Sequence, residues 1–127
     1  MVNLLLRFSV VLGLSGMAMG IVMGIRQDFS LAPAHAHLNL LGFVTLFLSG
    51  LYYRLVPQAG ASGLAQVQAA TAMIGAVVFP VGIGFALLGD HDRIFPLLVA
   101  GALAVFAGML LFAIIVFRTS SAAPQRS

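Results

Sequence analysis

The sequence predicts an all-α integral membrane protein with four membrane-spanning helices. Of its 127 residues, 61% are hydrophobic and only 7% are charged, and the mean hydropathy is +1.13. A soluble domain carries many more charges on its surface. One crossing of the hydrocarbon core takes about 20 apolar residues, so four crossings joined by short loops use almost the whole chain.

The net charge of +3 does not indicate a nucleic-acid-binding protein. The six basic residues are all arginines, and they stand singly along the chain instead of forming a basic patch. The positive-inside rule for membrane topology explains such scattered arginines better. The sequence also has no cysteine, which excludes disulfides, thiolate metal sites and cysteine nucleophiles. We therefore expect membrane lipid, and not nucleic acid, around this chain.

The first span is predicted from about Asn3 to Ile25, and the second from about Pro33 to Leu55. A proline suits the first turn of a helix because its missing N–H would be unpaired there. Gly16, Gly20 and Gly24 recur at every fourth position of the first span. This spacing lets two membrane helices approach closely, so we expect the glycine face to be a helix contact. The alternative is that glycine is simply common in membrane helices.

The third span is predicted from about Leu64 to Leu88, and the fourth from about Ile94 to Phe117. Pro80 should kink the third span because it removes one backbone hydrogen bond, a loss that membrane helices tolerate. Residues 89–93 are predicted to be the turn between these two spans. The four spans form one domain over residues 1–118, and residues 119–127 should be a mobile cytoplasmic tail.

The far end of the second span has the composition of an interfacial anchor. Tyr52 and Tyr53 should lie at headgroup level, and Arg54 should reach water. The acidic residues all fall in the predicted turns at the opposite end of the spans, whereas Arg118 and Arg126 share the end of Arg54. The positive-inside rule then places both termini in the cytoplasm. We expect the membrane to be the bacterial inner membrane.

His35 and His37 place two imidazoles near the start of the second span. Ionisable groups at membrane depth are costly, so two of them in one span indicate a functional site. Residues two apart on an α-helix are separated by about 200° around its axis, so the two rings point to nearly opposite flanks. They cannot both bind one iron from a single helix. Either only one is a ligand, or each serves a different site.

Heme is the cofactor that these residues favour. Imidazoles beside a large apolar wall, with no thiolate, suit heme better than a hard cation. Zinc or copper is the weaker alternative because the carboxylates that would complete the coordination lie only in the turns. His91 is more typical of an interfacial histidine bonded to water or a carbonyl. The flank of His35 should leave room for a flat macrocycle, because it is mostly small or polar and continues through Asn39, Gly42, Leu46, Ser49 and Tyr53.

Two runs of this second span resemble a known family. The run AHAHLNLL from Ala34 to Leu41, and GLYYRLVP from Gly50 to Pro57, resemble heme-bearing helices of the large subunit of heme-copper oxidases and nitric oxide reductases. The His-x-Asn-Leu-Leu and Tyr-Tyr-x-Leu-Val-Pro pieces are most similar to the nitric oxide reductase form. In that family twelve spans form three pseudo-symmetric arcs of four. The second helix of each arc carries a metal-ligating histidine, and one of these helices has a His-x-His that reaches two hemes.

The resemblance implies a homotrimer with heme b at its subunit interfaces. Three copies of a four-span chain would rebuild the twelve-span ring, and closed cyclic symmetry is the usual way to assemble one chain. His35 of one subunit and His37 of its neighbour would then be the two axial ligands of each of three hemes. The family holds heme propionates with arginines near the outer face, and this implies the same role for Arg26 and Arg93.

The departures from the family's pattern bear on activity. The oxidase copper site needs further histidines on other helices, and the first, third and fourth spans contain none. No carboxylate lies within a span to relay protons. Reduction of oxygen or nitric oxide is therefore not predicted. Iron with two axial histidines favours electron transfer, with a redox protein or a quinol as the partner.

Two other functions fit the same residues. The first is a heme sensor or carrier with one open coordination position, which carbon monoxide would occupy in the reduced protein. The second is a metal-free structural or assembly protein, in which the histidines bond Asn39, Thr45 or backbone carbonyls. In that protein no chromophore is present.

Overall fold

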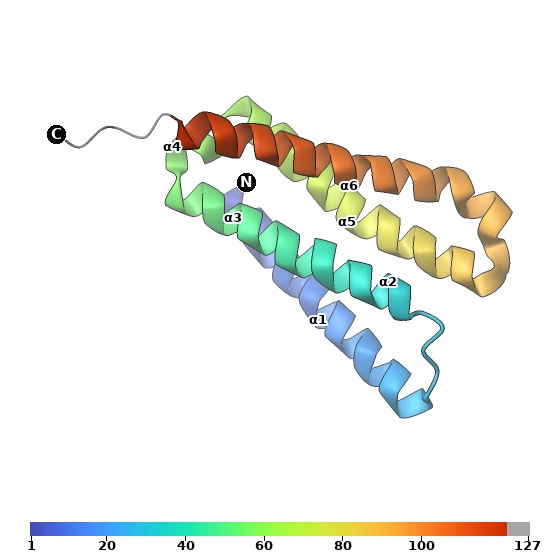
Figure 1. Ribbon diagram of the computed structural model, residues 1–127. Coiled ribbons are helices and arrows are strands. Elements are labelled where there is room, and N and C mark those ends of the chain that lie inside the picture. Colours follow the sequence, from blue (N-terminus) through green and yellow to red (C-terminus); the bar gives the residue numbers. More distant parts are fainter. Residues whose placement is uncertain (122–127) are drawn as a thin grey trace.

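The computed structural model describes residues 1–121, and four long helical segments run back and forth through it (Figure 1). Residues 119 and 120 of the predicted tail belong to the last helix, and residues 122–127 lie outside the described residues. The second segment consists of two α-helices with a π-helix between them. The elements in order are α1 Val2–Arg26, α2 Ala32–His37, the π-helix η1 Leu38–Thr45, α3 Leu46–Leu55, α4 Pro57–Gly60, α5 Gly63–Phe85, the π-helix η2 Ala86–Asp90 and α6 His91–Ser120.

All four segments are long and apolar enough to cross a membrane. They are Val2–Arg26, Ala32–Leu55, Gly63–Gly89 and His91–Ser120, and at most 28% of the most apolar stretch of each is buried inside the protein. Large apolar side chains therefore cover much of the outer surface. Such a surface is unfavourable in water but is what a lipid-embedded helix requires. The prediction of an all-α multi-pass membrane protein is confirmed.

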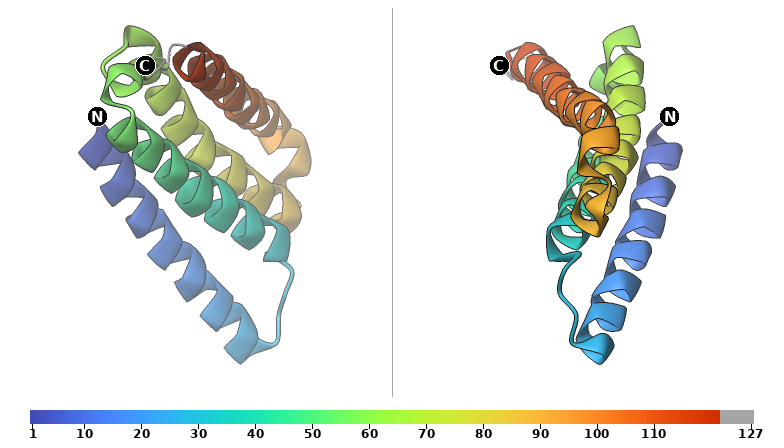
Figure 2. Two further views of the ribbon diagram at one scale, coloured as in Figure 1. Left: turned by 60° about the vertical axis from the view of Figure 1, so that its left-hand side comes forward. Right: turned by 90° about the vertical axis from the view of Figure 1, so that its right-hand side faces the viewer.

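The segments follow one another in a row, in chain order (Figure 2, left). α1 packs on η1 and α3, α2 and η1 pack on α5, and α5 packs along α6. The segment that carries His35 and His37 therefore lies between α1 and α5. Opposite flanks of this segment face different helices.

Small residues bring α5 and α6 into backbone contact. A Cβ atom added at Gly101 would lie 2.9 Å from the backbone N and Cα of Phe79. One added at Gly75 would lie 2.8 Å from the backbone N of Val105. Helices in lipid associate through such close van der Waals packing, because the surrounding acyl chains are as apolar as the side chains. These glycines fix the helix pair on which the second segment packs.

Gly101→Ala should lower the free energy of unfolding by about 1–3 kcal/mol, because the added methyl group overpacks the contact with Phe79. The control is Gly84→Ala, since a Cβ atom there meets only the Cβ of Ala34, at 3.9 Å. Equilibrium unfolding in mixed detergent micelles measures both values. Equal stability of Gly101→Ala and the wild type would contradict the close packing.

The sequence does not predict the two π-helical stretches. η1 follows directly on His37, and the Thr45 hydroxyl donates to the carbonyl of Leu40 at 2.9 Å, five residues back. A run of apolar residues has no polar face, so its sequence does not show how many residues make up one helical turn. The turn predicted at residues 89–93 is also shorter than expected, because the chain turns at Gly89, with φ at 108°, and α6 begins at His91. Glycine adopts positive φ without steric cost.

The prediction that Tyr53 lies at headgroup level is wrong. Its side chain is 1% exposed, and its hydroxyl donates to Oε1 of Gln68 at 2.8 Å. Tyr52 is half-buried, whereas Arg54 is exposed and donates to the side-chain oxygen of Asn3. A buried tyrosine hydroxyl needs a hydrogen-bond partner, and Gln68 of α5 supplies it.

Candidate functional site

His35 lies against the glycine face of α1. Its Nδ1 is 2.9 Å from the carbonyl oxygen of Gly16, and a Cβ atom added at Gly20 would lie 2.8 Å from its Cε1. A carbonyl oxygen can only accept, so Nδ1 carries the proton and the lone pair is on Nε2. The glycine face is therefore a helix contact, as its spacing predicts, and the His35 ring fills the space that it leaves.

Asn39 continues this contact one turn further along. Its amide nitrogen donates to the carbonyl of His35 at 3.0 Å and lies 3.2 Å from the His35 Nδ1. Because Nδ1 already donates to Gly16, the contact between the two nitrogens is not a hydrogen bond. A Cβ atom added at Gly16 would lie 2.5 Å from Oδ1 of Asn39. Asn39 therefore packs against α1 and bonds its own helix.

His37 faces the other neighbouring helix. Its Nδ1 is 2.7 Å from the carbonyl oxygen of Pro33, and its ring meets Phe79 of α5 edge-on, with 5.1 Å between ring centroids. The same argument places the proton on Nδ1 and the lone pair on Nε2. The two rings lie on different flanks of one helix, as a separation of about 200° requires.

Both imidazoles have the arrangement of metal-ligating histidines. Such a histidine usually donates its other ring N–H to a carbonyl or carboxylate, which fixes the tautomer and raises the basicity of the ligating nitrogen. Here each Nδ1 donates to a main-chain carbonyl, and neither Nε2 has a hydrogen-bond partner within residues 1–121. No fully buried side-chain nitrogen in that range lacks a partner, so each Nε2 is at least partly accessible.

The room expected for a macrocycle along the His35 flank is taken up by other helices of the same chain. Gly42 is buried, and a Cβ atom added there would lie 2.9 Å from Leu12. One added at Gly50 would lie 2.8 Å from Leu6. Small side chains suit a neighbouring helix as well as a flat cofactor, and the sequence did not distinguish the two. Gly42 is therefore a helix-packing position.

Two open apolar grooves flank the histidine-bearing segment. One, of about 290 Å³, lies between α1 and η1 and is lined by Met17 and Asn39 among others. The other, of about 220 Å³, lies between α1, α2 and α5 and is lined by Met19 and Ala34 among others. Met17 and Met19 are two residues apart, so the grooves open on opposite sides of α1. Pockets that enclose a ligand of drug size hold about 300–1,000 Å³, so each groove needs a further wall to enclose one.

Arg26 and Arg93 lie at the same end of the molecule as the histidines (Figure 1). Both are exposed, and within residues 1–121 no hydrogen bond joins either to a histidine. Arg26 borders a small groove with Asp28 and Ser30. Hydrogen bonds from the Ser30 hydroxyl and backbone N–H lower the pKa of Asp28, and the charge of Arg26 adds to this effect.

Other metal sites find little support in the described part of the chain. There, no three histidine, aspartate or glutamate side chains are grouped so that they could hold a metal ion. Structural zinc takes four protein ligands, and catalytic zinc takes three. His91 is exposed at the start of α6, and its nearest aromatic neighbour is Phe95, with 5.7 Å between ring centroids.

Comparison with known proteins gives no relative. No protein-family model, no curated protein and no solved structure matches this chain. The resemblance of residues 34–57 to heme-copper oxidases therefore stays a prediction. The function has to be argued from the geometry of the histidines.

The sequence allows for backbone carbonyls as partners of the histidines, but it does not say which carbonyls these are, and it does not point to an aromatic partner. The partners are the carbonyl oxygens of Gly16 and Pro33, and the ring of Phe79. A signal for the first was present, because Gly16 and Gly20 are four apart, as are His35 and Asn39. When glycines on one helix and larger side chains on its neighbour recur at the same interval, each side chain can pack against a glycine. No comparable signal points to Phe79.

Gly20→Ala should displace the His35 ring and break its bond to Gly16, because the new methyl group meets Cε1. Gly24→Ala is the matched control, since a Cβ atom at Gly24, one turn further along α1, has nothing within 4 Å. Imidazole ¹⁵N chemical shifts measure the outcome. The wild type and Gly24→Ala should show His35 protonated at Nδ1, and Gly20→Ala should shift this signal. A His35 ring protonated only at Nε2 in the wild type would contradict the assigned bond.

Proposed function

We propose that this chain is a small membrane cytochrome that binds heme b through Nε2 of His35 and Nε2 of His37 and transfers electrons. One observation carries the proposal: both Nδ1 atoms donate to main-chain carbonyls, which leaves two accessible Nε2 lone pairs in an apolar segment. Polar atoms without partners are costly there. Coordination to iron removes that cost.

The donor set fits heme better than a free metal ion. Neutral imidazoles are ligands that heme iron takes in proteins. Aromatic and aliphatic side chains such as Leu14, Phe43 and Phe47 line a groove that reaches Asn39, one helical turn from His35. Heme supplies one-electron redox chemistry when it is bound. The protein's part is to set the tautomer of each ring, to hold its direction and to keep water away from the site.

The proposed heme lies between the subunits of a homotrimer. His35 and His37 face α1 and α5 respectively, so the two rings of one chain are directed to different sites. The two grooves lie on opposite sides of α1, and a second copy could supply the wall that each lacks. The number of subunits comes from the resemblance to three arcs of four helices. Arg26 and Arg93 are the proposed partners of the heme propionates, because guanidinium groups bind carboxylates in bidentate pairs.

The proposed orientation puts both termini in the cytoplasm of a bacterial inner membrane. Arg54 and Arg118 lie at the end of the molecule where α1 begins and α6 ends, whereas Asp28 and Asp92 lie at the histidine end. The positive-inside rule then directs the histidine end outward. A redox protein or a quinol on that side is the proposed electron partner.

Wild-type protein purified from heme-replete cells should show the absorption bands of a reduced b-type cytochrome. His35→Ala and His37→Ala should each abolish the bands or convert the iron to high spin, because each removes an axial ligand. His91→Ala is the control and should keep the spectrum, since His91 is exposed at the start of α6. Absorption spectra of the dithionite-reduced proteins measure this. Colourless wild-type protein would overturn the proposal.

Co-expression of His35→Ala and His37→Ala chains should restore part of the low-spin heme. A mixed trimer contains interfaces in which an intact His35 of one subunit meets an intact His37 of its neighbour. Two different affinity tags isolate the mixed oligomers, whose spectra are compared with those of each variant alone. Mixed oligomers that bind no more heme than the single variants would show that the ligands are not shared between subunits.

One observation favours a second function, that of a metal-free structural protein. The bond from His35 to Gly16, with Asn39 beside it, ties the second segment to α1 without any cofactor. In that case His35→Ala would lower stability, and no chromophore would be present. A heme sensor or carrier would differ from both by binding carbon monoxide at an open position of reduced heme.

A further inference from the structure

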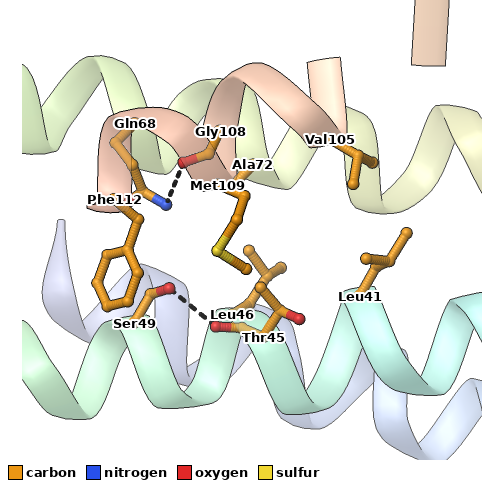
Figure 3. A pocket seen from close by; sticks show the side chains of 10 residues that line it. All are labelled: Leu41, Thr45, Leu46, Ser49, Gln68, Ala72, Val105, Gly108, Met109 and Phe112. Carbon is orange, nitrogen blue, oxygen red and sulfur yellow. Dashed lines mark hydrogen bonds between the residues drawn. The ribbon is translucent and has the colours of Figure 1, made fainter. Parts of the chain in front are cut away.

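A small cavity lies inside the protein, separate from the histidine site. It lies between η1, α3, α5 and α6 and has a volume of about 30 Å³. Its walls are mostly apolar, and the side chains with polar groups are Thr45, Ser49 and Gln68 (Figure 3). A cavity needs at least about 10–15 Å³ of such space to hold one water molecule. The cavity therefore has room for a water molecule and not for an organic ligand.

Gln68 has more donor capacity than the described residues use. Its side chain is 1% exposed, and its Oε1 accepts from Tyr53 at 2.8 Å. Its Nε2 donates to the carbonyl oxygen of Gly108 at 3.4 Å, which is long for a hydrogen bond. The carbonyl fixes the orientation of the amide, because an amide oxygen could not bond to it. The second N–H of Gln68 has no acceptor within residues 1–121.

Ser49 has acceptor capacity to spare on the facing side. Its side chain is 1% exposed, and its Oγ donates its proton to the carbonyl of Thr45 at 2.8 Å, which leaves the lone pairs of Oγ free. The Thr45 hydroxyl likewise donates to a main-chain carbonyl. In Figure 3 the amide nitrogen of Gln68 and the hydroxyl of Ser49 face one another, with Met109 and Phe112 on either side. A buried donor with an unused N–H and a buried acceptor with unused lone pairs thus line the same cavity.

We propose that one ordered water molecule occupies this cavity. It accepts the second N–H of Gln68 and donates a proton to the hydroxyl oxygen of Ser49. Buried waters typically make between two and four hydrogen bonds to groups that would otherwise lack partners, about three on average. This water joins α5 to α3 within the membrane, and it does not depend on heme binding.

The test is an NMR measurement on the full chain in lipid nanodiscs. The side-chain amide protons of Gln68 should show a cross-peak to a bound water in the wild type. Ser49→Ala should lose this cross-peak, because the water loses an acceptor. Ser9→Ala is the matched control: Ser9 is 0% exposed and donates to the carbonyl of Leu6 at 2.8 Å, but it does not line the cavity. Ser9→Ala should keep the cross-peak.

Two results would overturn the proposal. The first is a wild-type Gln68 amide that shows contacts to Met109 and Phe112 but none to water. The second is a cross-peak that survives in Ser49→Ala. A density map of the wild type, at a resolution that shows waters, gives a check that needs no variant. A peak within hydrogen-bond distance of Gln68 and Ser49 supports the water, and an empty cavity overturns it.

Discussion

The close approach of α1 to the second segment is the constraint on which the candidate site depends. Gly16 and Gly20 leave a space, and Asn39 and His35 fill it. Lipid does not drive helices together as water does, so shape and hydrogen bonds must hold this contact. The bond from His35 to the Gly16 carbonyl belongs to that contact and also decides which ring nitrogen keeps its lone pair. One hydrogen bond therefore contributes to helix packing and also sets the tautomer of the imidazole.

Composition alone was enough to predict the fold class and the four spans. Length and hydropathy report how much of a chain lies in lipid, and short loops leave few ways to divide it. They do not report how each helix is rotated about its own axis, because lipid and the protein interior are both apolar. Tyr53 illustrates this: it is typical of an interface by residue type, yet α3 directs it inward to Gln68. The stripe through Gly42 was misread for the same reason.

The candidate ligands could be named from the sequence, but most of their partners could not. Two imidazoles within a span are unusual enough to single out His35 and His37 by type alone. The partner of His35 is a main-chain carbonyl of another helix, and a carbonyl has no residue-specific signature. The partner of His37 is the carbonyl four residues earlier on its own helix, which becomes informative only once the ring direction is known.

The two histidine hydrogen bonds differ in which helix supplies the acceptor. His37 is tied to the helix that carries it, whereas His35 is tied to a neighbour. A sliding movement of α1 would therefore stretch the bond of His35 and leave that of His37 intact. A change in the position of α1 relative to the second segment therefore acts on one imidazole and not on the other.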